Sequence, residues 1–382
     1  MKYRRFGKET WEVSILGFGC MRLPLVKGGG PGAVDEKASI ALIRSAIDRG
    51  VNYVDTAYPY HDGQSEVVLG RALRDGYRDK VRVADKSPVW MIQRGEDFDK
   101  YLAEQMSRLG VEHIDCYLLH ALSDARWKGV LEAGVLERAE AAVRDGRIGA
   151  LGFSYHDGPA FFPKLVDAYD KWALAQIQYN YIDTENQAGT VGLRYAASRG
   201  LPVVVMEPLL GGRLAVPPPA VRALIETDPA HRTPSEIALQ WVWDQPEVAT
   251  LLSGMNAMIQ LDENLASAER SRVGSFGPAD LDLIDRVKAA FRARAVIPCT
   301  KCGYCDPCPS GVDIPGNFEL YNNGVIYDNM GMVRISYQRF FPENERANLC
   351  TQCRTCEEKC PQKIEISAWM PRIHDALGEK KP

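Results

Sequence analysis

The sequence lacks the features that mark exported, membrane-bound and nucleic-acid-binding proteins. No stretch approaches the ~20 apolar residues of a membrane-spanning helix, and the N-terminus has no apolar core like that of a secretory signal peptide. Basic residues are not in excess, because 46 Lys and Arg stand against 50 Asp and Glu, for a net charge of −4. We therefore expect a cytoplasmic protein that binds neither nucleic acid nor an anionic membrane.

Cysteine, in contrast, is concentrated. Eight of the ten cysteines lie in two short C-terminal runs that each end in Cys-Pro. A chain without an export signal uses dense thiols for metal ligation rather than for disulfides. Three cysteines at two-residue spacing, followed by Cys-Pro, are typical of bacterial two-cluster ferredoxins, so the pattern predicts two [4Fe–4S] clusters. Two Cys₄ zinc sites are the alternative, although zinc ribbons use separated Cys-x-x-Cys pairs.

The two runs are expected to exchange ligands. In ferredoxin-type runs, three thiolates of one run hold a cluster and the Cys-Pro cysteine of the other run completes it. The first run departs from the usual spacing, because only two residues precede its last cysteine. Both a structural and an electron-carrying role stay open for the clusters. The exchange predicts a first cluster on Cys299, Cys302, Cys305 and Cys360, and a second on Cys350, Cys353, Cys356 and Cys308.

Up to about residue 290, short apolar segments alternate with amphipathic helical patterns, clearest at 37–49, 135–145 and 278–294. Eight such units predict an α/β fold, a (β/α)₈ TIM barrel over 1–294. A small, ferredoxin-like and mainly helical iron–sulfur domain is expected over 295–382. A doubly wound sheet is the alternative, but no Gly-x-Gly-x-x-Gly turn follows the first strand. The predicted strands are 13–17, 51–55, 81–84, 114–119, 148–152, 175–178, 203–206 and 249–252.

Four chemically active side chains follow the ends of these strands. Asp55 and Tyr60 follow the second strand, Lys86 the third and His120 the fourth. The C-terminal ends of barrel strands meet at one face, where active sites form. A free tyrosine is a poor acid at neutral pH, and a neighbouring ammonium lowers its pKa. We expect Asp55 to hold Lys86, His120 to orient a substrate oxygen, and Tyr60 to protonate the alkoxide formed from a carbonyl.

At these residues the chain resembles the aldo-keto reductase family. The likeness covers about residues 3–290 and includes spaced motifs that agree in order. It implies a (β/α)₈ barrel that carries out NAD(P)H-dependent carbonyl reduction, or the reverse alcohol oxidation. The resembling segments are Gly50-Val51-Asn52-Tyr53-Val54-Asp55-Thr56-Ala57, Gly17-Phe18-Gly19, and Ser65-Glu66 followed by Leu69-Gly70.

The resemblance also implies a set of dinucleotide contacts, to which Asp55 belongs along with its catalytic role. The nicotinamide would lie by Gly19, Cys20 and Met21, with its carboxamide on Ser154 and Gln176. The pyrophosphate would follow Glu207, Pro208, Leu209 and Gly212, and the adenine would lie by Glu263 and Asn264.

The sequence departs from the family at several of these positions. Met206 stands where an aromatic residue often stacks on the nicotinamide. Ser253 and Gly254 replace a Lys-Ser pair that clamps the 2′-phosphate, and Gln260 replaces an arginine. A neutral amide cannot replace a guanidinium at a phosphate. The cofactor is therefore expected to be NADP or NAD, with the choice open.

Two functional hypotheses follow from joining a barrel to iron–sulfur clusters. In the first, an enzyme acts on a small carbonyl or alcohol, and its clusters are structural or exchange electrons with a ferredoxin or flavodoxin-like partner. In the second, electrons pass between the barrel site and a redox partner through the clusters. A non-enzymatic redox sensor is a third idea, against which the four intact residues argue. Trp90, Trp127 and Tyr58 are candidates for an aromatic pocket wall, with core or rim packing as the alternative for each.

Overall fold

The computed structural model describes residues 1–379 and divides into two compact units. The first combines Met1–Ala215 with Arg232–Pro278, and the second combines Val216–His231 with the chain from Ala279 onward. By this division the last long helix before the cysteines, α11 (Pro278–Arg292), belongs mainly to the second unit. The domain boundary expected near residue 294 stays a prediction, because compactness alone does not decide which segments fold together.

The first unit is a closed barrel of eight parallel strands, in the order β10-β3-β4-β5-β6-β7-β8-β9. This confirms the predicted (β/α)₈ architecture and excludes a doubly wound sheet, which would stay open. All eight predicted segments form strands, and several run further than the sequence indicated. The strands are β3 (Leu16–Gly19), β4 (Tyr53–Asp55), β5 (Arg82–Ser87), β6 (Ile114–Leu122), β7 (Ile148–Tyr155), β8 (Leu174–Gln178), β9 (Val203–Met206) and β10 (Val248–Ser253).

The first predicted strand is in fact two. Val13 belongs to β2 (Glu12–Ser14), which pairs antiparallel with β1 (Tyr3–Arg5) outside the barrel. Phe6 and Val13 are buried in one cluster with residues of the barrel strands, such as Tyr53. The N-terminal hairpin therefore adds its apolar side chains to the barrel core.

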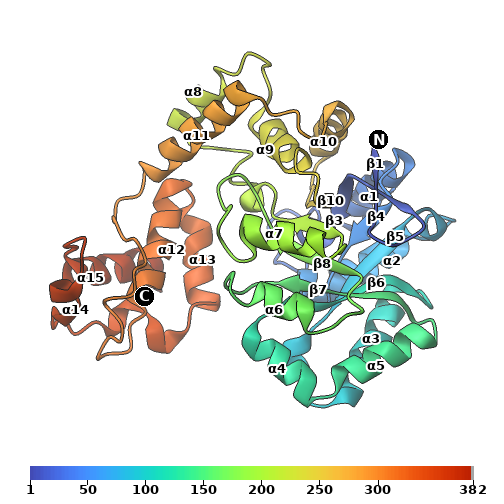
Figure 1. Ribbon diagram of the computed structural model, residues 1–382, viewed down its shortest axis with the longest axis horizontal. Helices are drawn as coiled ribbons and strands as arrows, with labels where there is room; N and C mark the ends of the chain where they lie inside the picture. The colour runs from blue at the N-terminus through green and yellow to red at the C-terminus, as the bar shows by residue number, and fades with distance from the viewer. Residues whose placement is uncertain (380–382) are drawn as a thin grey trace. The chain divides into compact units, whose positions relative to one another are not determined.

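Helices surround the barrel in Figure 1. The first helix, α1, has clear start and stop signals. At its start, the Asp35 side chain accepts a hydrogen bond from the Ala38 amide. After its end, the chain turns at Gly50, whose φ is 95°. The helices of this unit are α1 (Glu36–Asp48), α2 (Gln64–Ala72), α3 (Gly95–Leu109), α4 (Asp124–Glu132), α5 (Val135–Arg144), α6 (Phe162–Asp167), α7 (Gly189–Ser198), α9 (Pro234–Trp243) and α10 (Met258–Arg270).

The second unit is mainly helical, as predicted. Its core joins apolar residues of its helices, such as Phe318, Tyr337 and Met370, to partly buried cysteines. None of the helices described within residues 1–379 is long and apolar enough to cross a membrane. The helices are α8 (Pro219–Ile225), α11, α12 (Ile314–Ile326), α13 (Met330–Arg339), α14 (Thr355–Lys359) and α15 (Ile366–Leu377).

Candidate active site and cysteine-lined hollows

Three of the four expected catalytic side chains are joined through Lys86. Its ammonium donates to Asp55 Oδ1 at 2.5 Å, to the Thr56 carbonyl at 2.8 Å and to Tyr60 Oη at 3.4 Å. Lys86 and Asp55 are 1% and 3% exposed, whereas Tyr60 is only half-buried. The parallel register of β4 and β5 brings the first two together, and the short helix that begins at Tyr60 turns the phenol back over them.

His120 completes the group without bonding to it directly. Its ring lies edge-on to the Tyr60 ring, with 6.1 Å between the ring centroids. Its Nδ1 is buried and has no hydrogen-bond partner. A buried ring nitrogen without a partner is costly.

Burial decides the acidity of this group. The pKa of Tyr60 lies above its ordinary value because burial disfavours the phenolate, and the Lys86 ammonium offsets only part of that effect. Lys86 acts on Tyr60 in the expected direction, but burial outweighs its effect and the net pKa is raised. Burial also acts to lower the pKa of Lys86, but Asp55 and Tyr60 raise it above normal. Tyr60 and Lys86 therefore both keep their protons near neutral pH.

The two nearby histidines stay neutral. Burial, the Lys86 charge and the neighbouring His156 and Arg126 hold the pKa of His120 well below 6.5. Burial and the Arg126 charge lower the pKa of His156 to about 4. The His156 side chain is nonetheless exposed to solvent.

Gln176 and Ser154 lie on neighbouring strands, β8 and β7, beside the catalytic group. Gln176 donates to Asp55 Oδ2 at 2.9 Å, and its buried Oε1 has no partner. Ser154 accepts from the Ala121 amide at 2.7 Å, which leaves its hydroxyl hydrogen free to donate. A free acceptor beside a free donor fits a carboxamide, the group that the resemblance assigned to these two residues.

The other expected dinucleotide contacts lie at the ends of three strands. The strand β3 ends at Gly19, and the buried Cys20 and the 57% exposed Met21 follow it. The strand β9 ends at Met206, and the residues after it are Glu207, Pro208, Leu209 and Gly212, the last with a φ of 93°. The strand β10 ends at Ser253, and Gly254 follows it. The helix α10 carries Gln260, Glu263 and Asn264, of which Asn264 donates to Ser253 Oγ at 3.0 Å.

One arginine near these contacts was missed by the sequence reasoning. The Arg22 side chain packs along Gly254, and its guanidinium reaches Gly211, so that a Cβ added at either glycine would touch it. Burial raises the pKa of Glu207, and the Arg22 charge offsets part of that rise. The only available signal was its position directly after Met21. Arg270, at the end of α10, is paired with Glu236 and is therefore not free to bind a phosphate.

A second missed feature lies behind Lys86. Glu66 is fully buried, paired with Arg108 at 2.8 Å, and accepts from Gln105 at 2.9 Å. Gln105 also donates to the Lys86 carbonyl at 3.1 Å. Burial and the neighbouring Glu66 raise the pKa of Asp85 well above normal. The network ties α2 and α3 to the strand that carries Lys86.

Of the three aromatic residues predicted for a pocket wall, only Trp90 contacts a residue of the candidate catalytic group. The Trp90 ring lies 5.1 Å from the His120 ring and is 44% exposed, so it stands beside the catalytic group. Trp127 is buried against Trp172. Tyr58 turns away, because its hydroxyl donates to Glu104.

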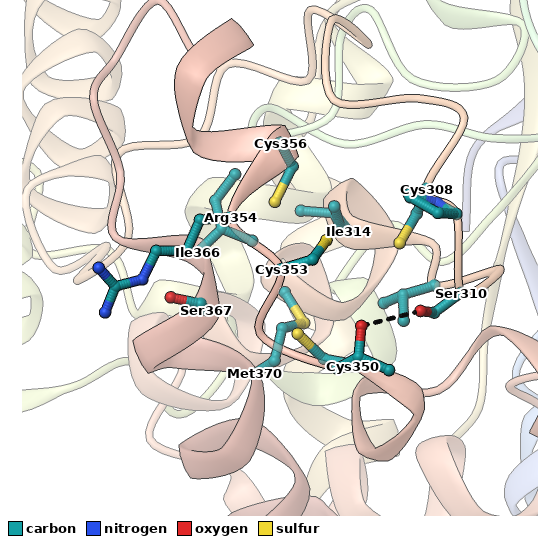
Figure 2. Close-up of a pocket in the computed structure, with 13 residues that line it drawn as sticks. Cys308, Ser310, Ile314, Cys350, Cys353, Arg354, Cys356, Ile366, Ser367 and Met370 are labelled. Atoms are coloured by element: carbon teal, nitrogen blue, oxygen red, sulfur yellow. Dashed lines mark hydrogen bonds between the residues drawn. The ribbon is translucent and has the colours of Figure 1, made fainter.

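The cysteines surround two hollows in the second unit. Figure 2 shows the first, of about 350 Å³, with Ile314, Ile366 and Met370 among its apolar walls. Its cysteines are Cys308, Cys350, Cys353 and Cys356. A second hollow of about 340 Å³ is lined by Cys299, Cys302, Cys305 and Cys360. Each hollow therefore combines three cysteines of one run with the Cys-Pro cysteine of the other.

Each hollow holds four thiols, the number of ligands that a [4Fe–4S] cluster takes. Backbone amides also approach the thiols: Lys301 donates to Cys299 Sγ at 3.5 Å and Gln352 to Cys350 Sγ at 3.4 Å. Such contacts stabilise thiolate ligands.

Comparisons with known proteins agree with this geometry. The family model described as "Aldo/keto reductase family" matches residues 15–275, and the one described as "4Fe-4S dicluster domain" matches residues 298–365. The NADH-specific methylglyoxal reductase of Escherichia coli is 27% identical over 320 residues, covering 70% of this chain and 93% of that protein. A probable aldo-keto reductase of Glycine max is 24% identical over 298 residues, covering 69% and 83%.

Solved structures share the barrel. A holo aldo-keto reductase from Bacillus halodurans aligns with a TM-score of 0.60 at 24% identity, covering 75% of this chain and 96% of that one. An aldo-keto reductase from Klebsiella pneumoniae in complex with NADPH aligns with a TM-score of 0.61 at 23% identity, covering 75% and 95%. At these identities the likeness shows the fold alone.

The histidine environment predicts a pH response. Since the pKa of His156 is about 4 when folded and 6.5 in its ordinary state, the unfolded chain binds more protons between these values. His156 and His120 should therefore add full stability above about pH 6.5, and that stability should fall as the pH drops toward 4. Ring NMR signals of both residues, assigned with a His156→Asn variant, should not titrate between pH 6 and 8. A His156 midpoint near 6.5 would contradict the lowered pKa.

Proposed function

Because this chain belongs to the aldo/keto reductase family and carries a 4Fe-4S domain after its barrel, we propose that it reduces an aldehyde or ketone with NADH or NADPH, or catalyses the reverse oxidation. The observation that carries this proposal is the chain of contacts from Asp55 through Lys86 to the half-buried hydroxyl of Tyr60. It ends in one proton donor that a substrate can reach.

In the proposed reaction, Tyr60 and His120 act on the substrate oxygen. Reduced nicotinamide, when bound, supplies a hydride to the carbonyl carbon. His120 orients the oxygen, and Tyr60 transfers its phenolic proton to it as negative charge develops there. Lys86 stabilises the resulting phenolate, and Asp55 keeps the ammonium in place. The raised pKa of Tyr60 keeps the proton on the phenol until the substrate takes it.

The nicotinamide would be held by the residues at the strand ends. Gln176 and Ser154 offer an acceptor and a donor for its carboxamide. Arg22 lies between the loops after β9 and β10, where a guanidinium would meet phosphate oxygens. We propose this arginine as an additional phosphate contact.

We further propose two [4Fe–4S] clusters in a domain that spans residues 295–382, with the barrel domain over 1–294. The two cysteine sets that line the hollows support the ligand exchange. Clusters of this type carry electrons singly. Cys302 and Cys353 are both exposed, which favours exchange of electrons with a ferredoxin or flavodoxin-like partner as the second candidate function.

Removing the Tyr60 hydroxyl should abolish carbonyl reduction. Loss of a general acid costs about 10²- to 10⁴-fold in kcat, while cofactor affinity should stay nearly unchanged. The experiment compares Tyr60→Phe with Tyr58→Phe, whose hydroxyl bonds Glu104 instead, using turnover of a panel of aldehydes and nicotinamide binding by fluorescence. A fully active Tyr60→Phe enzyme would disprove the assignment.

Ligand exchange predicts which cysteine losses fall on the same cluster. The double variant Cys302→Ala/Cys360→Ala should keep one intact [4Fe–4S] EPR signal after reduction, because both thiols line one hollow. The variant Cys353→Ala/Cys360→Ala should keep none. Cys116→Ala, in the barrel wall, serves as the control that keeps both. The opposite pattern in the two double variants would mean that each run holds its own cluster.

An anaerobic mixing experiment separates the two candidate functions. If the protein is a carbonyl reductase whose clusters take no part in the hydride reaction, NADH or NADPH added without substrate should leave the broad visible absorbance of the clusters unchanged. Nicotinamide transfers two electrons at once, whereas a cluster takes one. Bleaching, with dinucleotide binding verified in parallel, would favour the electron-transfer function and require a one-electron step.

A further inference from the structure

A positive charge without a carboxylate partner lies beside the candidate catalytic group. Arg126, in the first turn of α4, donates to the Ala121 carbonyl at 2.6 Å. No ion pair joins it to an acidic side chain within the part of the chain that the structure describes. The acidic residue nearest in sequence, Asp124, is paired with Lys128 at 2.7 Å.

The position of Arg126 connects it to the reacting group. Its guanidinium lies 5.4 Å from the centroid of the Trp90 ring, which lies 5.1 Å from the His120 ring. His120 in turn faces Tyr60. Arg126 therefore stands one aromatic ring away from the residue that would orient the substrate oxygen.

The surroundings respond to this charge. Arg126 is among the groups that lower the pKa of both His120 and His156, which means that the positive potential reaches the mouth of the site. Lys86 adds to that potential, but its charge is matched by Asp55. Arg126 is exposed to solvent, so a bound substrate can reach its charge.

We propose that the substrate of this site carries a carboxylate, which Arg126 binds while the carbonyl or hydroxyl group lies between Tyr60 and His120. This deepens the proposed function and rests on it. One Arg126 nitrogen is used by Ala121, and the rest of the planar fork remains for a carboxylate, the group that it matches in shape and charge. The exposed Trp90 ring supplies an apolar wall for the carbon skeleton between the two ends.

The test uses two probes that differ only in charge, 4-carboxybenzaldehyde and its methyl ester. The wild-type protein should favour the charged aldehyde in kcat/KM. Arg126→Gln keeps a donor for the Ala121 carbonyl but removes the charge. It should lose about 10- to 100-fold with the carboxylate, mainly through KM, since hydrogen bonds to charged groups are worth about 1.5–3 kcal/mol. The ester should change less than about threefold.

Two controls separate charge binding from structure. Lys128→Gln removes a cation from the same helix, one that already has a partner, and should leave both probes unchanged. Arg126→Lys should retain part of the preference, because charge survives while the fork is lost. Equal losses for both probes in Arg126→Gln would mean that the residue only supports the loop at Ala121, and would overturn the proposal.

Binding measurements distinguish this proposal from the proposed reaction. Calorimetry with benzoate and benzamide, in the presence of the dinucleotide, needs no turnover. If neither aldehyde is reduced but benzoate binds and loses affinity in Arg126→Gln, the reaction is wrong and the carboxylate site stands. If the aldehydes are reduced and benzoate binds both proteins equally, the reaction stands and the carboxylate site is wrong.

Discussion

The buried ion pair between Lys86 and Asp55 is the interaction on which the barrel site depends. Two charges removed from water are costly, and they are tolerated only when further hydrogen bonds satisfy them. Here the Thr56 carbonyl and Gln176 provide those bonds. Removal of one partner would leave an unpaired buried charge, at a cost of about 3–5 kcal/mol. The ion pair also keeps the Lys86 ammonium within reach of the Tyr60 hydroxyl. The contacts that stabilise the folded site are therefore the same contacts that position the proposed proton donor.

Rigidity around the pair comes from residues that touch no substrate. Glu66, Gln105 and Arg108 connect two helices to the main chain at Lys86. Hydrogen bonds and an ion pair of this kind hold a side chain in one orientation more firmly than apolar packing does, because they have preferred directions. A catalytic group must be held closely to be effective. The network explains why a lysine with a long flexible stem can serve as a fixed element of the site.

The proposed function joins two kinds of chemistry that differ in the number of electrons moved. A two-electron hydride reaction, completed by a proton from Tyr60, is proposed for the barrel. The second unit packs several of its cysteines against a small apolar core, with Met370 and Ile366 lining one hollow. In small domains of this kind, metal binding commonly contributes much of the folding free energy. The proposed clusters could therefore stabilise the domain whether or not they also carry electrons.

The sequence by itself determined the barrel and the ferredoxin-type domain, and it predicted the four strand-end residues and the pairing of the cysteine runs, because these depend on local periodicity and spacing. Eight apolar segments at regular intervals have few ways to bury themselves, and Cys-Pro runs have few uses. Only the tertiary structure decided the net acidity of Tyr60, the orphaned oxygen of Gln176, and the separation of Val13 into an outer hairpin. The same holds for Arg22 and Arg126, whose surroundings come from distant segments. The burial of a side chain and the electrostatic potential around it depend on all the residues that pack against it. Most of these residues are distant in the sequence, so a local sequence pattern does not predict them.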